Sequence, residues 1–141
     1  MVRSADAVWR GKLQDGKGEM KVQSGAFEVP FSFGTRFGDV PGTNPEELIG
    51  AAHAGCFSMQ FSAMVGQAGF TPNRVSTTAK VHVERVGAGF GITKIELHME
   101  AEIPGMDQAT FEQVAQDAKA NCPVSKALAA VPEITLDAKL V

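Results

Sequence analysis

The sequence has few charged residues and no basic block. Charged residues make up 21% of the 141-residue chain, and 16 acidic against 13 basic side chains leave a net charge of −3. Proteins that bind nucleic acid neutralise its phosphates with clustered Lys and Arg side chains, which are missing here. We therefore expect no nucleic-acid partner.

Long uninterrupted hydrophobic runs are missing as well. No apolar run approaches membrane-spanning length without a Gly or polar interruption, and residues 1–11 hold no apolar core of a signal peptide. We expect no membrane partner and a cytoplasmic protein. Repeats and low-complexity segments are also absent, and the length suits one compact unit, so we predict a single domain over residues 1–141.

Cysteine is scarce, with two residues, Cys56 and Cys122. Cysteines in a cytoplasmic protein are usually reduced, which disfavours a purely structural disulfide. The pair is more consistent with reactive or buried thiols. No CxxC motif occurs, because 66 positions separate the two residues (122 − 56), so any approach between them must come from the fold.

The longest apolar-rich segment, residues 43–70, predicts a helix of about six turns. Thr43 or Asn44 can cap its first turn, where Pro45 fits and where the only charges, Glu46 and Glu47, complement the helix dipole. Small or apolar residues occupy both faces, which is typical of a helix buried on every side. Since one small chain has limited means to bury such a helix, we expect a second subunit.

The remaining pattern predicts an α+β fold with a mostly antiparallel sheet. Three short strands in a meander come first, then an irregular aromatic stretch; a long hairpin, two helices and a closing strand follow the long helix. The expected strands are residues 7–9, 19–22, 26–29, 74–86, 90–103 and 132–141; the expected helices after the long one are residues 107–121, capped by Asp107, and 124–130.

The two thiols differ in their expected environment. Cys56 lies in the middle of the long helix among apolar neighbours, which raise a thiol pKa and make it inert. Cys122 precedes Pro123 at the start of a short helix, where free N–H groups favour the thiolate. If the fold brings them together, a peroxide can oxidise one thiol to a sulfenic acid, with which the second condenses to a disulfide.

A permanently charged guanidinium is the natural partner for such a thiolate. Arg36 stands alone among Phe residues and is the one candidate placed to steady a thiolate and a departing oxygen. Glu46 lies ten residues before Cys56, roughly 15 Å along a regular helix, so it cannot touch that cysteine. It could instead hold Arg36 and serve a thiol of a second subunit, or simply complement the helix dipole.

Two other functions use the same residues. His53 and Cys56 share a helix face, and with Cys122 they would supply the three ligands of a catalytic zinc. Alternatively, an apolar cavity lined by Phe31, Phe33, Phe37 and Phe57 could bind a lipid-like ligand, the thiols being incidental. A lone His in an Ala-rich helix is more often a packing residue, so the zinc enzyme is the least favoured of these functions.

Several blocks resemble the OsmC/Ohr family, osmotically inducible protein C and organic hydroperoxide resistance protein. The order and spacing of these blocks agree with the family over nearly the whole chain, and the residues within them are more similar to the OsmC branch. The blocks are TNPEELIGAAHAGCFSMQ (residues 43–60), TRF around Arg36, AGFTP (68–72), AGFGITKIEL (88–97) and NCPVSKAL (121–128).

The resemblance implies an intertwined homodimer with active sites at the subunit interface and no metal or organic cofactor. It implies a thiol-dependent peroxidase of oxidative and osmotic stress defence that reduces organic hydroperoxides, and hydrogen peroxide less well. By motif position Cys56 is the peroxidatic and Cys122 the resolving cysteine, while Arg36 and Glu46 are the activating arginine and its carboxylate partner. The implied reductant is a dithiol such as a lipoylated protein.

Overall fold

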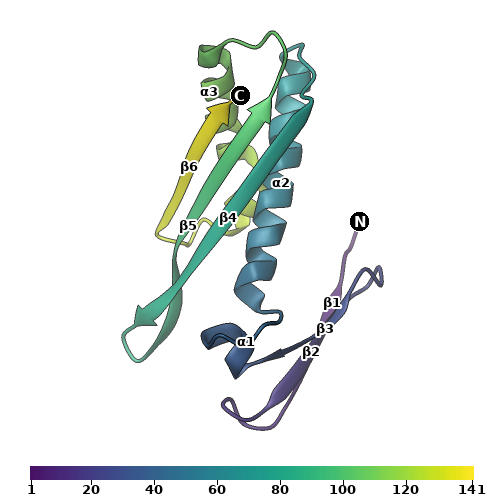
Figure 1. Cartoon of the computed structure of the whole chain (residues 1–141), viewed down its shortest axis with the longest axis vertical. Helices are drawn as coiled ribbons and strands as arrows, with labels where there is room; N and C mark the ends of the chain where they lie inside the picture. Colours follow the sequence, from purple (N-terminus) through teal and green to yellow (C-terminus); the bar gives the residue numbers. More distant parts are fainter. The chain divides into compact units, whose positions relative to one another are not determined.

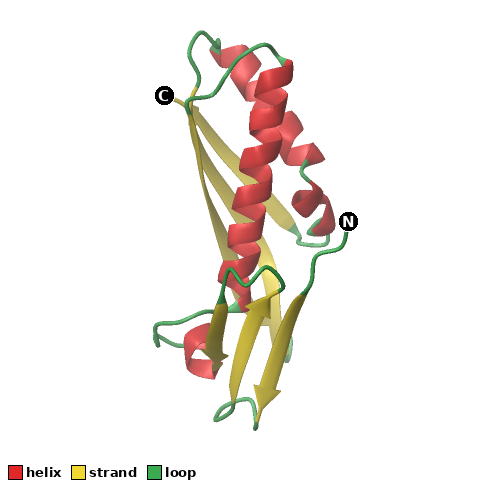
Figure 2. Cartoon of the chain, turned by 90° about the vertical axis from the view of Figure 1, so that its right-hand side faces the viewer, coloured by secondary structure: helices red, strands yellow, loops and turns green.

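The computed structural model describes residues 1–141, which divide into two compact units, Met1–Leu48 and Ile49–Val141. The boundary falls inside the long helix α2, Pro45–Gln67, whose first turn belongs to the first unit. The prediction of one domain is not tested by this division and stays a prediction. Figures 1 and 2 show the helices and strands of each unit.

The first unit is a three-stranded antiparallel meander followed by a short helix. Its strands are β1 (Ala5–Arg10), β2 (Lys17–Val22) and β3 (Glu28–Ser32), in the order β1-β2-β3, and the helix is α1 (Phe33–Phe37). The rings of Trp9 and Phe31 lie 5.3 Å apart over Gly18. A Cβ at Gly18 would come within 2.5 Å of the Phe31 ring, so only glycine allows this packing.

The predicted strand at residues 26–29 begins two residues before β3, and the helix α1 was not predicted. The strand continues through Pro30 to Ser32, since an edge strand tolerates a residue without an N–H. Residues 33–37, predicted to be irregular, form a helix. Ser32 and Thr35 start it by bonding each other's backbone N–H, a capping box that the low helix propensity of Gly34 obscures in the sequence.

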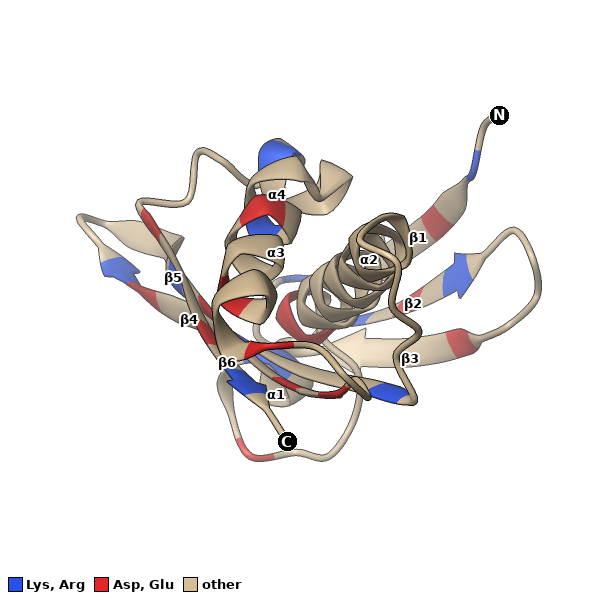
Figure 3. Cartoon of the chain, turned by 90° about the horizontal axis from the view of Figure 1, so that it is seen from above, with Lys and Arg blue, Asp and Glu red and all other residues tan.

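The second unit packs helices against one face of a three-stranded sheet, as Figure 3 shows from above. Its strands are β4 (Arg74–Val86), β5 (Gly89–Glu102) and β6 (Glu133–Leu140), in the order β4-β5-β6, and its helices are α2, α3 (Gln108–Asn121) and α4 (Pro123–Ala127). The expected hairpin β4–β5 is antiparallel, whereas β6 pairs with β5 in parallel. Helices α3 and α4 form the crossover that a parallel pair requires.

The core of this unit lies between α2, α3 and the sheet. Phe61 of α2 and Phe111 of α3 meet edge to face with ring centroids 5.7 Å apart. Besides His53 and Cys122, the residues that are essentially fully buried come from three elements: Phe57, Phe61 and Val65 of α2, Ile95, Leu97, Met99 and Ala101 of β5, and Phe111, Ala115 and Ala118 of α3. Aromatic pairs of this kind add to the burial of apolar area.

One face of α2 is not covered by the chain, as expected from the limited means of one small chain to bury this helix; its burial by a second subunit stays a prediction. Met59 is 76% exposed. Apart from Glu47 in the first turn and Gln67 at the end, the exposed residues of α2 are small or apolar: Ala51, Ala52, Gly55, Met59, Ala63 and Gly66. Figure 3 shows the helix without charge beyond its first turn.

Length and composition alone would allow α2 to cross a membrane, with a mean hydropathy of 1.2 over its most apolar window. This differs from the prediction that no run approaches membrane-spanning length, which rests on the Gly and polar residues that interrupt the helix. A helix that packs into a protein core meets the same description. The opposite face of α2 packs into the core of the second unit through Phe57, Phe61 and Val65.

Candidate active site

The fold brings the two cysteines into contact. Cys56 lies in the middle of α2, and Cys122 ends α3 and caps the start of α4, where Pro123 occupies the first turn. Their Sγ atoms lie 3.0 Å apart and share a hydrogen bond, with both thiols reduced. Cys122 is fully buried, whereas Cys56 is partly exposed, so Cys56 is the sulfur that a molecule from solvent can reach.

The two thiols differ in acidity in the direction that the sequence predicted. Burial, and then the hydrogen bond with Cys122, raise the pKa of Cys56. Burial also pushes the pKa of Cys122 upward, but hydrogen bonds from Cys56, from the backbone N–H and hydroxyl of Ser125 and from the N–H of Val124 outweigh it and lower that pKa. The surroundings therefore favour the thiolate of Cys122 over that of Cys56.

His53 lies three residues before Cys56 on α2 and is fully buried. Its Nε2 is 2.7 Å from the Oγ of Ser125, which links α2 to α4, while its Nδ1 is buried without a partner. Burial lowers the pKa of His53, so the ring is neutral at pH 7. From the sequence, His53 is either a packing residue or, less favoured, a metal ligand, and Ser125 has no predicted role, because its contacts arise from the fold.

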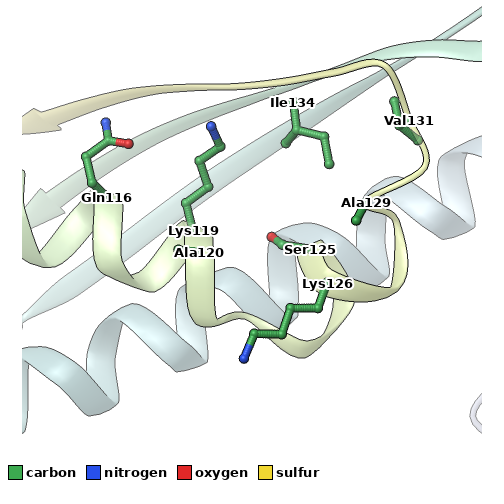
Figure 4. Close-up of a pocket in the computed structure, with 8 residues that line it drawn as sticks. All are labelled: Gln116, Lys119, Ala120, Ser125, Lys126, Ala129, Val131 and Ile134. Carbon is green, nitrogen blue, oxygen red and sulfur yellow. The ribbon is translucent and has the colours of Figure 1, made fainter.

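A cavity of about 430 Å³ opens onto Ser125. Figure 4 shows its lining, which comes from α3, α4, the loop that follows and β6. Lys119 and Lys126 contribute the charged groups and Ile134 part of the apolar wall. Ser125 thus lines this cavity, bonds to His53 and contributes to the lowered pKa of Cys122.

Arg36 and Glu46 form an ion pair within the first unit. Arg36 Nη2 lies 2.6 Å from Glu46 Oε1, and Nε lies 3.1 and 3.2 Å from Oε1 and Oε2. Asn44 joins the two helices, because its Nδ2 donates to the carbonyl of Thr35 and its Oδ1 accepts from the N–H of Glu47. Asn44 is therefore the cap of α2. Glu46 not only complements the dipole in the first turn of this helix but also binds Arg36.

An apolar cavity of about 220 Å³ lies beside this ion pair in the first unit. Its lining residues are Trp9, Leu13, Phe31, Ser32, Phe33, Arg36 and Phe37. The guanidinium of Arg36 lies 4.9 Å from the centroid of the Phe37 ring. The cavity contains three of the four Phe residues expected from the sequence; Phe57 is instead fully buried in the core of the second unit.

The zinc alternative is not supported by the side chains. No three of the His, Cys, Asp and Glu residues come together in an arrangement that could hold a metal ion. His53 directs Nε2 to Ser125 rather than to a sulfur. A catalytic zinc needs three protein ligands around one point.

The chain is similar in sequence and in fold to known proteins. The chain matches the OsmC-like protein family over residues 37–137, and it belongs to that family. Peroxiredoxin OsmC of Escherichia coli K12 is 52% identical over 139 residues, which cover 98% of this chain and 96% of that protein.

More distant relatives carry the other name of the family. An organic hydroperoxide resistance protein of Xanthomonas axonopodis pv. citri is 33% identical over 117 residues, 82% of this chain and 79% of that protein. The crystal structure of an OsmC-like protein from Mycoplasma pneumoniae shares the fold with a TM-score of 0.78 at 17% identity, covering 100% of this chain and 98% of that one. The α+β fold expected from the sequence is thereby confirmed.

Proposed function

We propose that the protein is a thiol-dependent peroxidase that reduces organic hydroperoxides, and hydrogen peroxide less well, in defence against oxidative and osmotic stress. The observation that carries the proposal is the 3.0 Å separation of the Cys56 and Cys122 sulfurs, one accessible and one buried. The names of the relatives in Escherichia coli and Xanthomonas support the same activity.

Cys56 is the peroxidatic residue in this proposal because its sulfur is the accessible one. Its thiolate attacks the terminal peroxide oxygen, so an S–O bond forms and the O–O bond breaks. The sulfur is oxidised to a sulfenic acid and the hydroperoxide leaves as an alcohol after taking up one proton. The Cys56 thiol must lose its proton before the attack: the Cys122 thiolate can accept this proton, and a nearby cation would stabilise the Cys56 thiolate that results.

Cys122 is the resolving residue. Its sulfur attacks the sulfenic sulfur of Cys56, so that an S–S bond forms, the S–O bond breaks and water leaves. The 3.0 Å separation makes this condensation possible with little movement of either side chain. A dithiol reductant, for which a lipoylated protein is our candidate, then attacks the disulfide and returns both thiols while it is itself oxidised to a disulfide.

Arg36 and Glu46 complete the proposed site. The carboxylate of Glu46 holds the guanidinium in a two-pronged contact, so its charge and remaining N–H groups are preoriented for a thiolate and a departing oxygen. The apolar cavity beside Arg36 offers room for the organic part of a hydroperoxide. No metal or organic cofactor enters these steps.

We propose further that two chains form an intertwined homodimer, and that Arg36 and Glu46 of one chain serve Cys56 of its partner. The uncharged, exposed face of α2 is the surface that a second copy would cover. Ten residues of helix between Glu46 and Cys56 argue against service of the same chain's thiol. Since the cycle needs reduced thiols at rest, we place the protein in the cytoplasm.

The test is to mix reduced protein with cumene hydroperoxide and to follow peroxide consumption and thiol loss. Wild type should turn over with a dithiol present, and Cys56→Ser should consume no peroxide. Cys122→Ser should complete one turnover and then become over-oxidised, because its sulfenic acid has no resolving thiol. Full activity of Cys56→Ser would overturn the assignment, and stoichiometric zinc in the purified protein would revive the zinc alternative.

A further inference from the structure

We propose that the external dithiol attacks the sulfur of Cys56, and not that of Cys122, when it reopens the disulfide. The first thiolate of the reductant forms an S–S bond with Cys56, while the bond between the two cysteines breaks and Cys122 leaves with the electron pair. The second thiolate then attacks the reductant sulfur of this mixed disulfide, and Cys56 leaves in turn. Each leaving sulfur takes up one of the two protons that the reductant gives up. The inference rests on the proposed peroxidase function and assigns a sulfur to its last step.

The first argument is access, because an attacking thiolate must reach the sulfur with which it forms a bond. Cys122 is fully buried where α3 ends and α4 begins, whereas Cys56 is partly exposed in the middle of α2. The cavity of about 430 Å³ beside α4 is lined by Ser125 but not by Cys122. A reductant that attacked Cys122 would therefore have to displace α4.

The same comparison holds in the proposed homodimer, although a second copy on the exposed face of α2 would reduce the exposure of Cys56. Peroxide must reach Cys56 for the proposed chemistry to occur, so the assembly has to leave a route to this sulfur. No step requires a route from solvent to Cys122, which needs to reach only Cys56, 3.0 Å away. The reductant therefore uses the route of the peroxide, and one sulfur meets both.

The second argument is the identity of the leaving sulfur. Burial acts to raise the pKa of Cys122, but neighbouring hydrogen-bond donors outweigh it, and this pKa lies below the ordinary thiol value. Burial raises the pKa of Cys56 above that value. In thiol–disulfide exchange the thiol of lower pKa leaves faster. Attack on Cys56 expels Cys122, the better leaving group, whereas attack on Cys122 would expel the poorer one.

The test traps the mixed disulfide in the unmodified protein. The disulfide is prepared with diamide, an oxidant that is not a peroxide, and is then mixed rapidly with excess mercaptoethanol. Acid stops the exchange, free thiols are alkylated in denaturant at mildly acidic pH, and mass spectrometry locates both groups. We expect mercaptoethanol on Cys56 with the alkyl group on Cys122 about ten times more often than the reverse, because access and leaving ability favour the same sulfur.

The same disulfide in urea is the matched control. Unfolding exposes both sulfurs and removes the donors around Cys122, so mercaptoethanol should attach to the two cysteines in comparable amounts. Cys122→Ser provides a second measurement. After one equivalent of cumene hydroperoxide, its Cys56 sulfenic acid should condense with mercaptoethanol to a mixed disulfide and water, which requires that an external thiol reaches this sulfur.

Mercaptoethanol mainly on Cys122 of the folded protein, or equally on both cysteines, would overturn the proposal and would mean that α4 moves aside. A Cys122→Ser sulfenic acid that does not react with mercaptoethanol would overturn it as well. Failure of the peroxidase function itself looks different, because wild type would then consume no cumene hydroperoxide. The disulfide made with diamide would still show which sulfur is attacked.

Discussion

At the scale of single residues, charge and access are divided between the two cysteines. Cys122 has a pKa below the ordinary thiol value, because the effect of neighbouring hydrogen-bond donors outweighs that of burial, but it is fully buried. Cys56 is accessible, but burial and its partner hold its pKa above the ordinary thiol value. The accessible sulfur therefore needs a cation, and Arg36, held by Glu46, is our candidate.

Arg36→Ala tests this at the scale of the residue. Without the guanidinium the apolar setting of Cys56 acts unopposed, so its pKa should rise further and its charged form should be populated only at higher pH. The rate of peroxide consumption at pH 7 should fall about a hundredfold, the cost typical of a lost charge-stabilising donor. Thiol alkylation against pH and stopped-flow kinetics measure the two effects.

Arg85→Ala is the matched control, since Arg85 also lies over a Phe ring, 5.8 Å from the centroid of Phe90. It should leave both the thiol titration and the peroxide rate unchanged. A titration of Cys56 that is the same in Arg36→Ala and in wild type would remove Arg36 from the mechanism.

At the scale of secondary structure, the sequence predicted those elements whose signals are local. Helix α2 has a cap at Asn44 followed by Pro45, and β4 and β5 alternate over most of their length, so the predicted limits of all three lie within a few residues of the observed ones. Helix α1 was missed because its capping box surrounds a glycine. The parallel pairing of β6 could not be read from its own residues, since it depends on the crossover through α3 and α4.

The properties of the site residues divide in the same way, into those with a local signal in the sequence and those that depend on the fold. The acidity of Cys122 could be predicted from Pro123, because the start of a helix provides N–H donors locally. The contacts of Cys56 with Cys122 and of His53 with Ser125 span 66 and 72 positions, and no spacing rule predicts them. Pairs that distant are determined by the packing of α2 against α4.

At the scale of the whole molecule, the proposed dimer makes a prediction about mixing. Arg36→Ala and Cys56→Ser homodimers should both be nearly inactive. A refolded mixture should regain about a quarter of wild-type activity, because half of its dimers are heterodimers and each has one complete site if Arg36 acts on the partner. Mass spectrometry should confirm that heterodimers form. A mixture no more active than its parents would mean that Arg36 serves its own chain or no thiol at all.

The most direct measurement on the central claim uses the unmodified protein. Reduced wild type is titrated with cumene hydroperoxide in the absence of reductant, and the product is digested and mapped by mass spectrometry. The account predicts that each peroxide consumed removes both thiols of one chain and leaves Cys56 linked to Cys122, with the alcohol as product. Peroxide loss without thiol loss, or cysteines linked between chains, would contradict it.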